Sequence, residues 1–270
     1  MPIIPSHPIT ALSEEAFHKL DYSVMAIAFD IHNRMGRFYD EQIYKNKLKQ
    51  QCLAKGLHVG SEVEIKLIHE DYAKSLFVDL LINNSVYELK TIKSIQEPQR
   101  IQTLDYLFSS NTQHGKIINF RPPSVEHEFV STTLNHESRK EFHIQDSRWK
   151  EHSPNARKLR SCLSNIINDW GAFLDTHLYE EVLIHLLGGE QEIIRPIEIN
   201  SDGISLGRQK LACLSDSEFF LITAAKGETK RFETHLNRLL LNTPMQILYW
   251  INLNRSTIQL VTLEKKSFCS

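Results

Sequence analysis

Three charged side chains in one stretch of alternating residues could do chemistry together. Asp79 precedes Glu88 by nine positions, and Lys90 follows Glu88 by two. Because successive side chains of a strand point to opposite faces, Glu88 and Lys90 project on the same face. Two adjacent carboxylates repel unless a divalent cation lies between them. A neighbouring lysine can orient or deprotonate a water, or stabilise charge on a phosphate, so the spacing indicates a metal-assisted hydrolytic site.

The same spacing occurs on solvated sheet faces, so the surrounding residues have to decide between the two interpretations. Apart from Asp79 and Glu88, the segments 76–82 and 86–89 are apolar, as expected of central strands. Ionisable side chains in such strands cost free energy unless they are paired or bound to a metal. The apolar surroundings therefore favour a functional site.

Helices and strands of a mixed α/β domain are predicted around these residues. Ser13 is expected to cap a helix, and a second helical pattern covers 38–53, after the interruption at Met35-Gly36. From 59 to 90 the apolar period is two, as in strands. Within that segment Asn83-Asn84 predicts a tight hairpin turn that brings Asp79 opposite Glu88.

Two further elements offer accessory side chains. Glu41 and Tyr44 share a face of the second helix, and we expect Tyr44 to pack in the core. A third helical pattern over 101–107 places Gln102 and Tyr106 on one face, and a short strand is expected over 117–120. An added acid and an amide would complete a site for a hydrated metal and a phosphate.

These residues resemble the GxxExxY proteins, a branch of the PD-(D/E)xK nuclease superfamily. The resemblance extends from about residue 24 to 130 and includes GRFYDEQIY (36–44), the Asp79/Glu88/Lys90 core and the Gln102-x-x-x-Tyr106 helix. Phe38 stands where the family usually has a second glycine, and Val78 stands where a proline often precedes the acid. Neither departure removes a ligand.

The resemblance implies a restriction-endonuclease-like core, a central mixed sheet flanked by helices, and phosphodiester cleavage that depends on Mg²⁺ or Mn²⁺. It implies that Asp79 and Glu88 are metal ligands, with the Leu89 carbonyl as a third and Glu41 as an accessory acid. It implies that Lys90 is the catalytic lysine. Gln102 would position a phosphate or the lysine, and the residues expected to bind the substrate are Tyr106, Lys93, Arg100 and Lys116.

The second half of the chain repeats the first. GRFYDEQIYKNKL (36–48) aligns without gaps with GAFLDTHLYEEVL (171–183), and Ile118-Asn119-Phe120 corresponds to Ile251-Asn252-Leu253. We therefore predict two related lobes, a pseudo-dimer within one chain. In the second lobe Thr176, Leu221 and Thr223 take the positions of Glu41, Glu88 and Lys90, so this lobe is predicted to be a degenerate copy.

The expected domains are 1–134, a polar connector over 135–160, and 161–270. Composition excludes several other classes: 41% of residues are hydrophobic and the net charge is −2, which argues against a disordered or polybasic protein. No apolar run reaches the about 18 residues of a membrane span, and no signal peptide is evident, so we expect a cytoplasmic protein.

The leading hypothesis is a metal-dependent nuclease acting on DNA. The alternative is a non-catalytic nucleic-acid-binding or scaffold protein built from two nuclease-like lobes. A role in a mobile-element or defence system would concern its context rather than its chemistry.

Overall fold

The computed structural model describes residues 3–227 and 229–265, and these divide into two units. The first unit ends at Ser138 and the second begins at Arg139. Residues 1–2, 228 and 266–270, which belong to the expected segments 1–134 and 161–270, lie outside the described residues. No described helix combines the length and the apolar character needed to cross a membrane.

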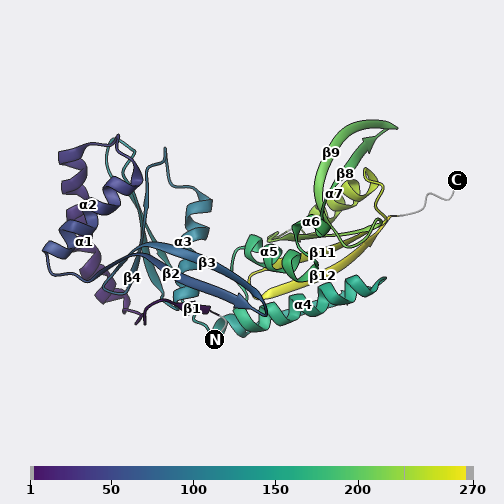
Figure 1. Cartoon of the computed structure of the whole chain (residues 1–270), viewed down its shortest axis with the longest axis horizontal. Coiled ribbons are helices and arrows are strands. Elements are labelled where there is room, and N and C mark those ends of the chain that lie inside the picture. The colour runs from purple at the N-terminus through teal and green to yellow at the C-terminus, as the bar shows by residue number, and fades with distance from the viewer. Residues whose placement is uncertain (1–2, 228, 266–270) are drawn as a thin grey trace. The chain divides into compact units, whose positions relative to one another are not determined.

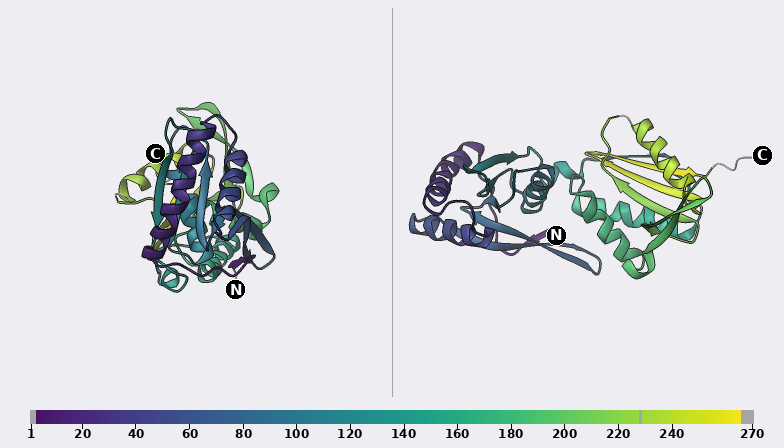
Figure 2. Two further views of the ribbon diagram at one scale, coloured as in Figure 1. Left: turned by 90° about the vertical axis from the view of Figure 1, so that its left-hand side faces the viewer. Right: turned by 90° about the horizontal axis from the view of Figure 1, so that it is seen from above.

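The first unit is a six-stranded mixed sheet with helices on both faces (Figures 1 and 2). Its strands lie in the order β1-β2-β3-β4-β5-β6, and β4 and β5 are its one parallel pair among the described strands. Helices α1 and α2 cover one face and α3 the other (Figure 1). In chain order the elements are β1 (Ile3–Pro5), α1 (Glu14–Met35), α2 (Glu41–Ala54), β2 (Val59–His69), β3 (Tyr72–Ile82), β4 (Ser85–Lys90), α3 (Glu97–Ser110), β5 (His114–Asn119) and β6 (Glu126–Ser131).

The local signals in the sequence explain where these elements begin and end. Ser13 caps α1 by accepting a hydrogen bond from the amide of Ala16. Gly36 ends α1 with a φ of 75°, a conformation that favours glycine. Asn83 and Asn84 have φ values of 43° and 66° and form the two-residue turn between β3 and β4, as expected.

One apolar core holds α1 and α2 against the sheet. Buried side chains of α1 pack on alternate residues of the central strands, so the helical and the strand periods meet in the same core. The members include Phe17, Val24, Ile31, Tyr44, Leu48, Leu80, Tyr87, Leu89, Ile118 and Phe120. Along β3 and β4 the core residues Leu80, Tyr87 and Leu89 alternate with Asp79, Glu88 and Lys90. The three charged side chains therefore point to the other face of the sheet.

The second unit has the same order of helices and strands with one additional short helix, and its first strand lies at the other edge of its sheet. Its sheet order is β7-β12-β11-β10-β9-β8, and β10 and β11 are parallel, as β4 and β5 are. The elements are η1 (Ser138–Lys140), which crosses the boundary between the units, then β7 (His143–Arg148), α4 (Pro154–Trp170), α5 (Thr176–Leu187), α6 (Glu190–Ile193), β8 (Ile194–Ser201), β9 (Ile204–Cys213), β10 (Glu218–Thr223), α7 (Thr229–Leu241), β11 (Ile247–Asn254) and β12 (Thr257–Glu264). Helices α4 and α5 lie on one face and α7 on the other (Figure 2).

The segment 135–160, expected as a connector, contributes instead to the second unit. It contains β7, which pairs in parallel with β12, and the first turns of α4. Strand β7 is an edge strand, and most of its side chains are exposed. An exposed edge strand carries polar residues, which explains why this segment resembles a linker in composition.

The two units share two unusual side-chain arrangements. The Tyr44 hydroxyl donates to the Gly36 carbonyl at 2.6 Å, and the Tyr179 hydroxyl donates to the Gly171 carbonyl at the same distance. Both pairs join the start of the second helix to the turn that ends the first. They lie within the aligned segments 36–48 and 171–183.

A buried asparagine makes the second shared arrangement. Asn119 accepts from the Ile92 amide and donates to the Ile92 carbonyl and to Glu126. Asn252 makes the same three bonds with the amide and carbonyl of Ala225 and with Gln259. In both units the asparagine therefore fixes the segment that leaves the central strand.

Candidate active site of the first unit

Strands β3 and β4 separate where the two carboxylates lie. Their ladder runs from Ile82 and Ser85 at the turn to Leu80 and Tyr87. The next opposed pair in this register would be Asp79 and Glu88. From Glu88 to Lys90, β4 pairs with β5 and no longer with β3. The acidic residues therefore lie where a central strand is paired on one side only.

Asp79 takes the place of the missing backbone acceptor. Its Oδ2 accepts the backbone N–H of Leu89 at 2.9 Å, which satisfies an amide that β3 no longer reaches. The side chain is buried. This bond holds Asp79 against β4 at the residue next to Glu88.

Glu88 is almost fully buried and only half of its carboxylate has a partner. Oε1 accepts from Lys90 Nζ at 2.5 Å, whereas no donor contacts the buried Oε2. Burial and the charge of Asp79 raise the pKa of Glu88 to about 8, although Lys90 opposes the shift. The structure thus holds a buried carboxyl oxygen that has no hydrogen-bond partner among the described residues, in surroundings that favour its protonated form.

A second lysine, Lys45, was not anticipated from the sequence. It projects from α2, is buried, and donates to Asp79 Oδ1 at 3.0 Å and to Glu62. Burial lowers its pKa, but the hydrogen bonds and charges of Glu62 and Asp79 outweigh burial and raise it. Lys45 lies one helical turn after Glu41, and that spacing of four residues is the signal that could have identified it.

Glu62 extends the row of acids onto a third strand. In the register of β2 and β3, Ser61 opposes Leu80 and Val63 opposes Val78, which places Glu62 opposite Asp79. Glu62 has a φ of 52°, a left-handed conformation that is unfavourable for a glutamate in a strand.

Glu41 faces the same cluster from the first turn of α2. Burial raises its pKa, and the nearby charges of Lys90, Asp79 and Lys45 act on it in opposite directions. Its carboxylate also receives a hydrogen bond from the backbone of Thr91, directly after Lys90. The accessory acid expected from the sequence therefore lies beside Lys90 and Asp79.

Helix α3 brings Gln102 and Tyr106 to this cluster. Gln102 Nε2 donates to the Tyr106 hydroxyl at 2.9 Å. Burial raises the pKa of Tyr106, and the charges of Glu88, Asp79 and Glu62 add to that shift. Gln102 contacts the site through Tyr106, and among the described residues it makes no hydrogen bond to Lys90 or to a carboxylate.

The basic residues expected to bind the substrate are not gathered around the carboxylates. Lys116 is buried in an ion pair with Asp21 of α1 at 2.8 Å, in register with core residues Ile118 and Phe120. Because side chains alternate along β5, Lys116 lies on the α1 face, so it is held by the core and does not reach the site. Arg100 pairs with Glu128 of β6 through two hydrogen bonds of 2.5 and 2.9 Å. Lys93 is exposed in the segment between β4 and α3.

The donor set suits a divalent cation of the magnesium type. Such ions prefer carboxylate oxygens, and the unpartnered Glu88 Oε2 next to Asp79 is an oxygen of that kind. In this structure Lys45 pairs with Asp79 and Lys90 pairs with Glu88, so each carboxylate has a cationic partner. Within the described ranges, no three His, Cys, Asp or Glu side chains are close enough to form a ligand group. A cation would thus compete with the lysines for two principal carboxylates.

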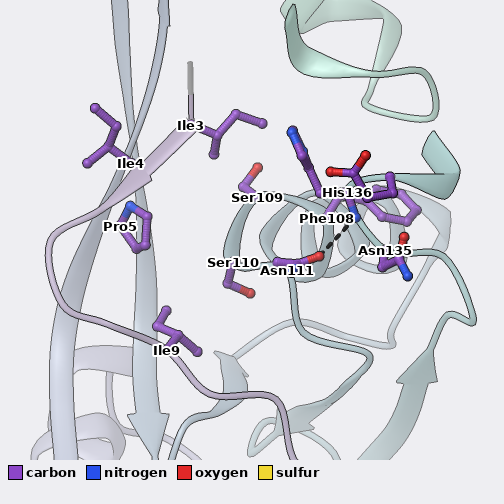
Figure 3. Close-up of a pocket in the computed structure, with 11 residues that line it drawn as sticks. Ile3, Ile4, Pro5, Ile9, Phe108, Ser109, Ser110, Asn111, Asn135 and His136 are labelled. Carbon is purple, nitrogen blue, oxygen red and sulfur yellow. Dashed lines mark hydrogen bonds between the residues drawn. The ribbon is translucent and has the colours of Figure 1, made fainter. Parts of the chain in front are cut away.

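One cavity of the first unit lies away from these carboxylates. It measures about 700 Å³ and is bounded by β1, the end of α3 and residues 135–137, as Figure 3 shows. Ile3, Phe108 and Ser109 are among its lining residues, and the backbone of His136 donates to Asn111 at 2.9 Å at its edge. None of the site acids lines it.

The second unit does not reproduce the charged cluster. Thr223 pairs with Asn252 as Lys90 pairs with Asn119, so Thr223 and Leu221 occupy the positions of Lys90 and Glu88. Ala212 pairs with Phe220 as Leu80 pairs with Tyr87, so Ala212 is the equivalent of Leu80. The residue equivalent to Asp79 is therefore Leu211 and not Ala212. Neither a carboxylate nor a lysine remains on these strands at the three positions.

A model of the PD-(D/E)XK nuclease superfamily matches residues 18–131 of the chain. The match begins in α1 and ends with β6, so it contains every side chain of the cluster. It supports a nuclease-superfamily assignment for the first unit, and the mixed sheet flanked by helices fits that fold. No curated protein and no solved structure matches the chain.

Proposed function

We propose that the first unit is a divalent-metal-dependent nuclease of the GxxExxY branch that hydrolyses phosphodiester bonds, with DNA as the expected substrate. The observation that carries this proposal is the pair Asp79 and Glu88 at the point where β3 and β4 separate. One oxygen of this buried pair, Glu88 Oε2, has no partner. A buried carboxylate oxygen in this state is costly in a purely structural role, and a cation would satisfy it.

The side chains then have distinct roles. Asp79 and Glu88 would hold Mg²⁺ or Mn²⁺, with the Leu89 carbonyl and Glu41 as further ligands. When bound, such an ion lowers the pKa of a coordinated water and polarises a phosphoryl oxygen. Tyr106 would contact a substrate phosphate, and Gln102 donates the hydrogen bond that fixes the Tyr106 hydroxyl.

Lys90 acts as a cation in this proposal. Burial lowers its pKa, but the charges of Glu88, Glu41 and Asp79 raise it more, so the ammonium is protonated near neutral pH. A protonated lysine cannot remove a proton from water. It can stabilise the negative charge that develops on the phosphate, which selects one of the two roles that the sequence had left open.

Lys45 is a positioning residue. It fixes Asp79 Oδ1 from α2 while the Leu89 amide fixes Oδ2, so both oxygens of Asp79 are oriented before any ligand arrives. Orientation of a metal ligand by its neighbours is a general requirement of metal sites.

We further propose that the second unit is a degenerate copy of the first. The shared tyrosine–glycine and asparagine arrangements, and the matching order of β2–β6 and β8–β12, support a duplication. Without the acids, this lobe would bind or position the substrate and would not cut it. If both lobes only bind, the chain is instead a non-catalytic nucleic-acid-binding or scaffold protein.

The deciding experiment assays the purified chain on linear, circular and single-stranded DNA and on RNA, with Mg²⁺ or Mn²⁺. Lys90→Ala should reduce cleavage by about a hundredfold to a thousandfold, the typical effect of losing one group that stabilises developing charge. The matched control is Lys226→Ala, an exposed lysine just after β10 in the second unit. Cleavage by Lys90→Ala at the wild-type rate would contradict the assignment, and binding without cleavage by the wild type would favour the scaffold.

A further inference from the structure

The loop between α1 and α2 carries three large side chains in succession. Phe38 is 77% exposed and Tyr39 is 46% exposed, which is unusual for consecutive aromatic residues. The Arg37 guanidinium lies over the Phe38 ring, 5.1 Å from its centroid. We call residues 37–39 the stacking loop.

The stacking loop is held in a fixed conformation. The Tyr44 hydroxyl donates to the Gly36 carbonyl at 2.6 Å and accepts from the Tyr39 amide at 3.3 Å, so one side chain closes both ends of the loop. Tyr44 itself stacks on Phe120 in the core, with a centroid distance of 4.5 Å. The exposed rings are therefore presented by a rigid support, and a ligand would not have to order them.

The loop lies beside the carboxylate cluster. It leads through Asp40 into Glu41, whose carboxylate is close to Lys90, Asp79 and Lys45. Three residues of chain span at most about 11 Å, so the Cα of Phe38 lies within that distance of the Cα of Glu41.

The second unit provides an internal comparison. Its equivalent turn is closed in the same way by Tyr179. Ala172 and Leu174, at the positions of Arg37 and Tyr39, are only 3% and 4% exposed, and Phe173, at the position of Phe38, is half-buried. Both units thus share the closed turn, but among the described residues two consecutive exposed aromatic rings occur at this turn in the unit that carries Asp79, Glu88 and Lys90 and not in the other, so closing the turn does not require them.

We propose that the stacking loop binds unpaired bases of the substrate strand next to the scissile phosphate. This inference rests on the proposed function and specifies its substrate class: single-stranded DNA, or a junction at which single-stranded DNA leaves a duplex. Aromatic rings and an arginine plane stack on bases of any sequence. The loop also carries the acidic Asp40, so its contribution to affinity comes from bases and less from phosphate charge.

The test measures binding of a fluorescein-labelled single-stranded oligodeoxynucleotide and of a blunt duplex of the same sequence to the full chain. Lys90→Ala with Mg²⁺ is used as the background, to keep the strand intact. Phe38→Ala and Tyr39→Ala should each weaken single-strand binding about 5- to 150-fold, the range that stacking contributes per base. Phe38→Leu should weaken binding almost as much, because it keeps apolar volume but has no ring, whereas Phe38→Trp should retain it.

The matched control is Tyr22→Ala. Tyr22 is an aromatic of α1 that is 82% exposed and lies outside the loop, so its removal should leave single-strand binding unchanged. Blunt-duplex binding should change little in any of these variants, because its bases are stacked internally.

Three results would overturn the inference: wild-type affinity in Phe38→Ala, an equal loss of affinity for duplex and single strand, or self-association of the wild type that Phe38→Ala abolishes. The last would make the loop a contact between copies of the chain. Cleavage by the protein with Lys90 intact is scored separately. Ring-dependent binding of single-stranded DNA without cleavage would contradict only the nuclease proposal. Cleavage without ring-dependent binding would contradict only the inference about the stacking loop.

Discussion

Lys45 donates to Asp79 at 3.0 Å across 34 residues of sequence, and it is the one contact in the cluster that ties α2 to β3 through opposite charges among the described residues. Both side chains are buried. Removing one member of such a pair leaves the other charge uncompensated in a poorly solvated place. The stability of the metal-free protein therefore depends on this lysine.

The first prediction concerns that dependence. Lys45→Met should lower the free energy of unfolding by about 3 kcal/mol in EDTA, the lower part of the range for a broken buried pair. The loss should shrink in Mg²⁺, because a cation bound by Asp79 replaces the missing charge. Urea denaturation in the two buffers measures both values.

Lys66→Met is the matched control. Lys66 forms an exposed pair with Glu64 at 3.6 Å on β2, so its replacement should cost no more than about 1 kcal/mol in either buffer. An equal loss for Lys45→Met with and without Mg²⁺ would mean that the ion does not bind at Asp79.

The second prediction tests the metal site directly. A ligand that binds only the folded state adds about 2.7 kcal/mol of stability at a hundredfold excess over its dissociation constant. Mg²⁺ or Mn²⁺ should therefore raise the melting temperature of the wild type, and raise it less in Asp79→Asn. Glu64→Gln, an acid on neighbouring β2 that accepts from Ser75, should behave as the wild type. Equal shifts in all three proteins would place the ion elsewhere.

The third prediction follows from the raised pKa of Glu88. Its pKa is about 8 in the folded chain, against about 4.3 for an unperturbed glutamate. Between these values the folded state binds the proton more tightly than the unfolded state. The contribution of Glu88 to stability is therefore complete below about pH 4 and is lost as the pH rises toward 8.

Glu88→Gln should remove this component of the pH dependence. In EDTA, the free energy of unfolding of Glu88→Gln minus that of the wild type should increase between pH 5 and pH 8, and then level off. The comparison of the two proteins removes the contributions of groups with lowered pKa values, such as Asp146 and Glu233. At lower pH those groups make the free energy of unfolding rise with pH, opposite to the effect of Glu88. A flat difference across this range would show that Glu88 is already ionised near its ordinary pKa.

The fourth prediction concerns the asparagine shared by the two units. Asn119→Ala and Asn252→Ala each remove four hydrogen bonds and leave the partly buried amide and carbonyl of Ile92 or Ala225 unsatisfied. Each should destabilise its own unit by at least about 1–3 kcal/mol, the cost of one such group. Hydrogen exchange resolved by peptide should show the loss in β4–β6 for Asn119→Ala and in β10–β12 for Asn252→Ala. Exchange that increases in both units for either variant would contradict a local role.

The sequence predicted those features that depend on neighbouring residues. The structure contains the helix that Ser13 was expected to cap, the turn at Asn83-Asn84 and the two strands that carry Asp79 and Glu88. Each of these features is determined by residues only a few positions apart in the sequence. The proposed duplication rests on an aligned Gly-x-Phe-x-Asp segment, and the structure shows equivalent hydrogen bonds within the two copies of that segment.

What the sequence did not predict depends on long-range contacts. Lys116 was assigned to the substrate because basic residues near a site attract phosphates, but Asp21, 95 residues earlier, holds it within the core. Glu62 lies in the alternating segment 59–90, and its part in the site follows only from the pairing of β2 with β3 and from its bond with Lys45 of α2. No pattern within a short window contains such information.

The two-residue turn at Asn83-Asn84 also determines the order in which the site can form during folding. Only nine positions separate Asp79 from Glu88, and a β-hairpin closes in about 1–10 μs. Lys45 arrives only when α2 docks, after the entropy cost of a much longer loop has been met. A nascent chain would thus assemble its acidic pair before the lysine that neutralises it, and divalent ions could stabilise the hairpin during that interval.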